Sequence, residues 1–405
     1  MVKRICTVRQ NGKEDFERII ALGYTGVVFF EPEDSGIELA NGLGLETYAD
    51  SPKASFLFFN SVSEENIQKT QDREAVFYLP DIADYDENIL ISRLPKNSGV
   101  LIPFEARQNV KREDASVKAS FGAVAVCEPA DELKNFISLA KKADIKVYVQ
   151  NFLGGKTEEM PVYIPALMQW MLRKQSCDAL ICDGFVESGA DGFEENIVTE
   201  FVSRLYKSSD APGLCLAKLA GEKYKENGQK MIMAFKYASD GANFILPEAA
   251  DVNGPFAFSA SYPLVEDAIY DFPFDKKDVT LEIDSLLRAK ENFIKAANTA
   301  TGIDGEIEGI CRFISSTLET AINAKKWYRR LYAAKKEKQN VRKKFLFEQM
   351  VNIAKRELEN TQVCAEILFN NPTIAQSACG INAIEAKIRL TEAAAQNLKI
   401  QIQQM

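Results

Sequence analysis

The amino-acid sequence predicts an α/β fold, a (β/α)8 barrel of the TIM type over residues 1–275, followed by an all-α helical bundle domain over residues 276–405. Short, nearly continuous apolar runs alternate with amphipathic stretches, which is typical of a parallel sheet with helices on both faces. About ten such runs precede Pro273, which fits eight barrel strands with one or two false assignments. After Pro273 the apolar spacing becomes helical. A doubly wound open sheet is the alternative fold.

The strand candidates follow one another as strand–helix–strand units. The first unit runs from a strand at residues 5–8, through an amphipathic helix that ends at Gly23, to a strand at residues 26–30. The clearest repeat of the unit is AVAVCEPADELKNFISLAKKADIKVYVQNF at residues 123–152. The remaining candidates are residues 45–48, 55–59, 75–79, 99–103, 179–182 and 243–246.

Four long helices are predicted after Pro273. Their apolar stripes cover residues 278–300, 307–331, 347–368 and 381–402. Stripes of this kind bury themselves against other helices, either within a bundle or against a second subunit. We therefore expect self-association through residues 276–405.

Composition is that of a globular protein. Hydrophobic residues make up 46% of the chain and charged residues 26%. No apolar run reaches the roughly 18 residues that a membrane span needs, and the N-terminus lacks the apolar segment of a signal peptide. The eight cysteines form no Cys-x-x-Cys pair, which indicates reduced core thiols. We expect a cytoplasmic protein.

Charge is unevenly distributed along the chain. Residues 281–405 hold 19 Lys and Arg against 14 Asp and Glu, whereas the preceding residues hold 30 against 44. This acidic major part argues against nucleic acid as a partner. The basic run at residues 325–344 is interpreted as a solvated helix face that pairs with acids of its own chain or of a neighbouring subunit. Nucleic acid or an anionic membrane surface is the alternative partner of this run.

The chain contains no histidine, which excludes Ser-His-Asp triads, Cys-His dyads and His-ligated metals. The acid-rich segment at residues 183–195 does not have the spacing of a calcium-binding loop. We expect no cofactor and no metal. Carboxylates are the chemical groups that remain in quantity.

Polar residues directly follow many of the apolar runs, and in a parallel barrel such positions meet at the edge where active sites lie. Two carboxylates across a cavity can divide acid and base roles. Asp183 and Glu248 form the best predicted catalytic pair, with Glu128 third; caps for the following helices are the alternative role for such acids. The predicted substrate-binding residues are Asn151, Lys156, Glu31 and Glu105.

A strand that closes in an acid (ALICDGF), a helix, and a later strand that closes in glutamate (ANFILPEA) follow in this order. In this respect residues 1–275 resemble carbohydrate-active (β/α)8 barrels of the glycoside hydrolase type. The resemblance implies an intracellular hydrolase that acts on a carbohydrate ligand with paired carboxylates. One alternative is a non-catalytic scaffold or self-assembling protein built on a degenerate barrel. A lyase or phosphate-handling barrel that uses the loop of Gly154, Gly155 and Lys156 is another.

Overall fold

A computed structural model gives the structure of the chain. It describes residues 3–8, 12–29, 31–70, 73–80, 82, 85–105, 109–111, 116–118, 123–152, 162–188, 195–245, 261–265, 279–374 and 381–405. The chain divides into two compact units. Met1–Glu158 with Leu167–Leu219 form the barrel unit, and Glu159–Ala166 with Ala220–Met405 form the helical unit. The predicted domain boundary between residues 275 and 276 lies outside the described residues.

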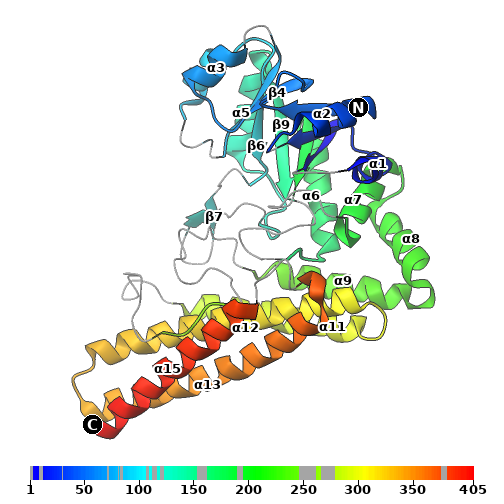
Figure 1. Ribbon diagram of the computed structural model, residues 1–405. Coiled ribbons are helices and arrows are strands. Elements are labelled where there is room, and N and C mark those ends of the chain that lie inside the picture. The colour runs from blue at the N-terminus through cyan, green and yellow to red at the C-terminus, as the bar shows by residue number, and fades with distance from the viewer. Residues whose placement is uncertain are drawn as a thin grey trace. The chain divides into compact units, whose positions relative to one another are not determined.

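The barrel unit contains a closed barrel of eight strands, which confirms the predicted fold class (Figure 1). Every neighbouring pair is parallel, in the order β1-β10-β9-β6-β5-β4-β3-β2. All carboxyl ends of the strands therefore lie at one edge. The strands are β1 (Lys3–Val8), β2 (Gly26–Phe29), β3 (Glu46–Ala49), β4 (Phe56–Phe59), β5 (Ala75–Tyr78), β6 (Gly99–Pro103), β9 (Lys146–Phe152) and β10 (Gly184–Ser188).

Side chains fill the interior of the barrel. Each strand contributes one residue to a buried interior cluster: Ile5, Val28, Tyr48, Phe58, Val76, Leu101, Tyr148 and Val186. The barrel is thus a packed core rather than a pore, as this fold requires. Any site has to be built at its edges.

The amino edge of the barrel is closed by aromatic and charged side chains. Lys3 donates to both carboxylate oxygens of Glu46 at 2.7 Å, and the Tyr48 hydroxyl donates to Glu46 at 2.9 Å. The Tyr148 ring passes over Gly184, where a Cβ would lie 2.9 Å from ring atom Cδ1. Glycine is required there because any side chain would displace the ring. Burial raises the pKa of Tyr148 to about 12, so its hydroxyl stays protonated at physiological pH.

Helices cover the outside of the barrel, and their apolar faces follow the 3.6-residue period. Between β6 and β9 a short antiparallel pair, β7 (Asn109–Lys111) with β8 (Ser116–Lys118), precedes the helix α5. The helices are α1 (Lys13–Ala21), α2 (Asp34–Gly42), α3 (Glu64–Thr70), α4 (Glu87–Arg93), α5 (Asp131–Lys142), α6 (Leu167–Ala179), α7 (Ile197–Lys207) and α8 (Pro212–Tyr224), whose last turns belong to the helical unit.

Three strand predictions were wrong. Residues 123–127 form turns that bury Ala123, Val124 and Val126 without joining the sheet, because β6 pairs directly with β9. Residues 179–182 are the end of α6 and the connection after it, and the strand β10 begins only at Gly184. The described part of residues 243–246 is a turn after a helix.

The helical unit consists of long helices packed side by side. The helix α9 (Gly228–Ala242), which follows the short 3₁₀ turn η2 (Lys225–Asn227), packs against α11 (Thr280–Ala300). Helix α11 packs against α12 (Gly305–Lys336), α12 against α13 (Asn340–Asn370), and α13 against α15 (Ile381–Gln404). The four predicted helices are confirmed. Asp304 caps α12 by accepting from the backbone nitrogens of Glu306 and Ile307.

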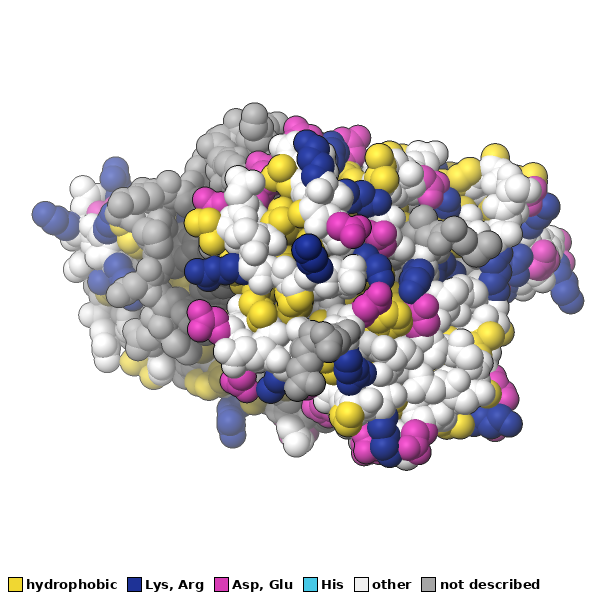
Figure 2. Space-filling view, turned by 90° about the horizontal axis from the view of Figure 1, so that it is seen from above, with side chains coloured by type: hydrophobic (Ala, Val, Ile, Leu, Met, Phe, Trp, Pro, Cys, Tyr) yellow, Lys and Arg dark blue, Asp and Glu magenta, His cyan; other side chains and the backbone are white. Residues whose placement is uncertain are grey.

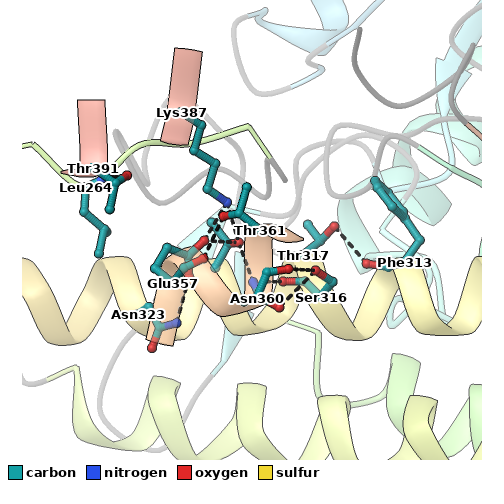
Figure 3. A network of polar contacts seen from close by, with 11 residues as sticks. Leu264, Phe313, Ser316, Thr317, Asn323, Glu357, Asn360, Thr361, Lys387 and Thr391 are labelled. Carbon is teal, nitrogen blue, oxygen red and sulfur yellow. Dashed lines mark hydrogen bonds and ion pairs between the residues drawn. The ribbon is translucent and has the colours of Figure 1, made fainter. Parts of the chain in front are cut away.

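A buried polar network joins α12, α13 and α15 (Figure 3). Glu357 accepts from Lys387 at 2.5 Å and from the Thr320 hydroxyl at 2.6 Å through Oε1. Its second oxygen accepts from the Asn323 amide at 2.7 Å. Lys387 also donates to Thr320 at 3.0 Å. Both charges are inaccessible to solvent, and both carboxylate oxygens have partners, as a stable buried ion pair requires.

The basic run at residues 325–344 is divided between core and surface. Lys325 is buried rather than solvated as predicted, and it forms an ion pair with Glu282 of its own chain at 2.7 Å. Trp327 is also buried and donates to the carbonyl of Val265, whereas Lys335 and Lys338 are exposed. No described helix combines the length and the low charge that a membrane crossing requires.

Candidate functional site

The carboxyl edge of the barrel is the first place to look for a site, because active sites of (β/α)8 barrels form there. Side chains alternate across a strand, so residues two positions beyond the interior cluster point toward this edge from inside the barrel. Thr7 and Gln150 occupy such positions in β1 and β9, and both are buried. Asp50 and Asn60 directly follow β3 and β4, and both are exposed. The edge thus carries a hydroxyl, two amides and a carboxylate.

Thr7 is the deepest of these groups. Its side chain is fully buried, and its hydroxyl has no hydrogen-bond partner within the described residues. A buried hydroxyl without a partner costs free energy, roughly 1–3 kcal/mol. Such a cost is usually met by a bound water or ligand.

Glu105 is held in a buried ion pair just beyond β6. It accepts from Nη2 of Arg173 on α6, whose Nε donates to the carbonyl of Val126 at 3.0 Å. The guanidinium lies 4.6 Å from the ring centre of Phe104 and 5.2 Å from that of Trp170, which adds cation–π attraction. Oε2 of Glu105 and Nη1 of Arg173 have no hydrogen-bond partners within the described residues.

Asn151 belongs to the same cluster. Its Nδ2 donates to the Cys177 sulfur at 3.5 Å, and its Oδ1 has no hydrogen-bond partner among the described residues. Burial raises the pKa of the Cys177 thiol to about 12, so the thiol is neutral at physiological pH. Cys177 lies one turn after Arg173 on α6. The structure therefore brings together two of the predicted substrate-binding residues, Glu105 and Asn151, against one helix.

The backbone explains why these two residues contact the same helix. β6 and β9 are neighbours, and the nitrogen of Phe104 donates to the carbonyl of Gln150 at 2.8 Å. Glu105 follows Phe104 beyond the end of β6, and Asn151 follows Gln150 within β9. We name the four residues Glu105, Asn151, Arg173 and Cys177 the α6 cluster.

A second buried carboxylate of the barrel, Glu187 in β10, also forms an ion pair with an arginine. Its side chain points outward, where Arg4 donates to it at 2.6 Å and the Tyr24 hydroxyl donates at 2.6 Å. Burial, with the nearby Glu187 charge second, raises the pKa of Tyr24 well above its usual value. This network fastens β1 and β10 to the surrounding helices.

Asp183 lies at the opposite edge from the one predicted. It precedes β10 rather than ending a strand, and its carboxylate accepts from the backbone nitrogen of Val147 at 2.8 Å. Val147 is near the start of β9. Asp183 thus holds the amino ends of two neighbouring strands together, at the edge that in this fold serves stability.

The other predicted residues are dispersed. Glu31 is exposed two residues after β2, and Glu128 is exposed in the loop before α5. Glu248 and Lys156 lie outside the described residues, so the predicted pair of Asp183 and Glu248 has no measured separation. Sequence reasoning missed Asp50 and Asn60, although each directly follows an apolar run. It also missed Arg173, for which a helical arginine gives no signal.

Neither a metal site nor a broad basic surface is evident. Among the described residues, no group of three or more Cys, Asp and Glu side chains is placed to hold a metal ion. On the face shown in Figure 2, basic and acidic side chains of the described residues are interspersed. Nucleic acid requires a continuous basic surface, which this face of the described part does not offer.

Comparisons with known proteins find similarity among solved structures. No family model matches the chain, and no curated protein matches it. Among solved structures, the chain is similar to a mutant of the Thermobaculum terrenum O-GlcNAc hydrolase, with 11% sequence identity and a TM-score of 0.38. The match covers 99% of this chain and 93% of that chain. A similarity at this level does not assign an activity.

Proposed function

We propose that this protein is a carbohydrate-active hydrolase whose ligand binds at the carboxyl edge of the barrel, with Glu31 and Asp50 as the paired carboxylates. One observation carries the proposal: both carboxylates are exposed, and they follow neighbouring strands. β2 and β3 pair in parallel with Val28 opposite Tyr48. Neighbouring strands are about 4.8 Å apart. Asp50 directly follows β3 and Glu31 comes two residues after β2, so the two carboxylates leave adjacent strand ends at the carboxyl edge.

This spacing suits hydrolysis of a glycosidic bond. The reaction uses two carboxyl groups about 5 to 10 Å apart, one as general acid and the other as nucleophile or base. Asp183 has no part in the proposal because it lies at the amino edge, while Glu248 and Lys156 remain predictions from the sequence.

The neighbouring side chains suit a sugar. Asn60 follows β4, beside β3, and offers an amide donor and acceptor to hydroxyl groups. Amides and carboxylates bind the hydroxyl groups of sugars.

The test is turnover of a panel of 4-nitrophenyl glycosides by the full chain and by Asp50→Asn and Glu31→Gln. General acid or base catalysis contributes about 10² to 10⁴ to the rate, so we expect each variant to lower kcat/KM at least about a hundredfold. Glu17→Gln, an exposed carboxylate on α1, is the matched control and should keep full activity.

Three outcomes would count against the proposal. Full activity in both variants would exclude Glu31 and Asp50 as the pair. If no glycoside is turned over, binding of the same panel is measured by calorimetry. Binding without turnover would leave a carbohydrate-binding barrel and exclude the hydrolase, whereas neither binding nor turnover would exclude carbohydrate as the ligand.

A further inference from the structure

Helix α13 carries a second heptad stripe, on the side away from its buried residues. The spacing alternates between three and four residues, so these side chains lie on one side of the helix. Two of them are large and apolar, and both are exposed: Phe345 by 58% and Val363 by 52%. The stripe consists of Arg342, Phe345, Gln349, Asn352, Arg356, Glu359, Val363 and Glu366.

The stripe is complementary to itself in the antiparallel direction. If two copies of α13 lie antiparallel with the heptads in register, each position of one copy faces a fixed position of the other. Phe345 then faces Val363, and Arg342 faces Glu366. Gln349 faces Glu359, and Asn352 faces Arg356. Every pair is apolar, oppositely charged or hydrogen-bonding, and two-fold symmetry repeats each pair.

A cavity lies beside the apolar end of the stripe. Its volume is about 550 Å³, and it runs along α12 between the flanking helices α11 and α13. Val363 and Glu366 of the stripe line it, together with the half-exposed Ile294 of α11. Since Phe345 of a second copy faces Val363, its ring comes to the cavity. Aromatic side chains that fill pockets are the usual anchors of interfaces.

We propose that α13 forms a two-fold antiparallel interface with α13 of a second copy of this chain, with Phe345 of each copy anchored in the cavity beside Val363 of the other. This interface belongs to the helical unit and is independent of the chemistry at the barrel edge. Because most of its pairs are polar, we expect a small interface that dissociates on dilution.

The test exploits the two-fold symmetry. Arg342→Glu places two carboxylates opposite each other twice in the dimer, and Glu366→Arg places two cations opposite each other twice. Sedimentation velocity of the full chain over a roughly hundredfold range of concentration measures the dissociation constant. We expect each single reversal to raise that constant at least about tenfold. The double variant with both reversals should restore it, and Phe345→Ser should abolish the dimer.

Matched controls make the same charge changes elsewhere. Lys399→Glu and Glu392→Arg alter exposed positions on α15, outside the stripe, and should leave the dissociation constant unchanged. Circular dichroism confirms that the variants keep their helices. A wild-type chain that stays monomeric at all concentrations would overturn the proposal. So would a dimer that tolerates the single reversals, or one that the double reversal fails to restore.

Discussion

The barrel unit and the helical unit each bury an ion pair, and the two pairs are built differently. Glu357 in the helical unit uses both carboxylate oxygens, which accept from Lys387, Thr320 and Asn323. Glu105 in the barrel unit pairs with Arg173 through one oxygen, and its Oε2 and the Nη1 of Arg173 have no hydrogen-bond partners within the described residues. Both carboxylates are fully buried.

The difference indicates what each pair is for. A buried polar group without a partner costs roughly 1–3 kcal/mol, so a pair that serves stability alone is expected to satisfy all of its atoms. The Glu357 pair meets this condition and ties three helices together. The α6 cluster does not meet it, and it lies at the edge of the barrel where sites form. We infer that it is arranged to receive a water or a polar ligand group.

The largest expected effect comes from Glu357→Gln. The glutamine amide places a donor against either Asn323 or the donors at Oε1, and Lys387 keeps a buried charge without a counter-ion. Removing one partner of a buried pair costs about 3–5 kcal/mol. The free energy of unfolding in urea measures this loss. Trp327 reports on the helical unit when Trp170, the other tryptophan, is replaced by Phe.

The control for this variant is Glu392→Gln at an exposed position of α15, which should change the stability by less than about 0.5 kcal/mol. A loss of under about 1 kcal/mol for Glu357→Gln would mean that the pair contributes no more than a surface ion pair. The contrast between the two units would then fail.

A smaller effect is expected from Glu105→Gln. The amide oxygen can keep the hydrogen bond from Arg173, while the amide nitrogen takes the position of the oxygen that has no partner. The rings of Phe104 and Trp170 continue to stabilise the guanidinium. We expect a loss of about 1–3 kcal/mol, measured by the fluorescence of Trp170 in a Trp327→Phe background. Glu132→Gln, exposed on α5, is the control.

The order of these two losses is the informative quantity. Glu105→Gln could lower the free energy of unfolding as much as Glu357→Gln, or more. The atoms of the α6 cluster that have no partner among the described residues would then already be hydrogen-bonded in the folded protein. The cluster would then be a structural ion pair like that of the helical unit.

A third buried ion pair, between Glu187 and Arg4, explains why one strand could not be predicted from the sequence. Seven strands of the barrel coincide with apolar runs and were predicted. β10 was missed because Glu187 interrupts its apolar pattern. That carboxylate is buried only because Arg4, far away in the sequence, pairs with it. Displacing the strand to residues 179–182 moved Asp183 to the wrong edge of the barrel.

The α6 cluster was half predictable for a similar reason. Glu105 and Asn151 follow apolar runs, so their position at the carboxyl edge could be read from the sequence. Arg173 and Cys177 lie on a helix, and only the folded chain shows that this helix faces the ends of β6 and β9. Asp50 and Asn60 had the right position after a strand and were overlooked among more acidic segments.

The smallest expected effect tests whether the Cys177 thiol of the α6 cluster is shielded from solvent. Burial raises the pKa of the Cys177 thiol to about 12 from an ordinary value of 9.0, so the folded state binds this proton more tightly than the unfolded state. The stability that this gives is complete below pH 9 and is lost as the pH rises toward 12, by about 1.4 kcal/mol per pH unit. Cys177→Ala removes this dependence. The difference in unfolding free energy between wild type and variant should therefore shrink by about 1.4 kcal/mol from pH 9.5 to 10.5, since all other groups titrate alike in both. The control is Cys311→Ala in the helical unit, where burial also raises the thiol pKa. It should behave in the same way. If the difference is constant for Cys177 but not for Cys311, the Cys177 thiol ionises as it does in water. The α6 cluster would then be open to bulk solvent rather than a buried site for a single water or ligand group.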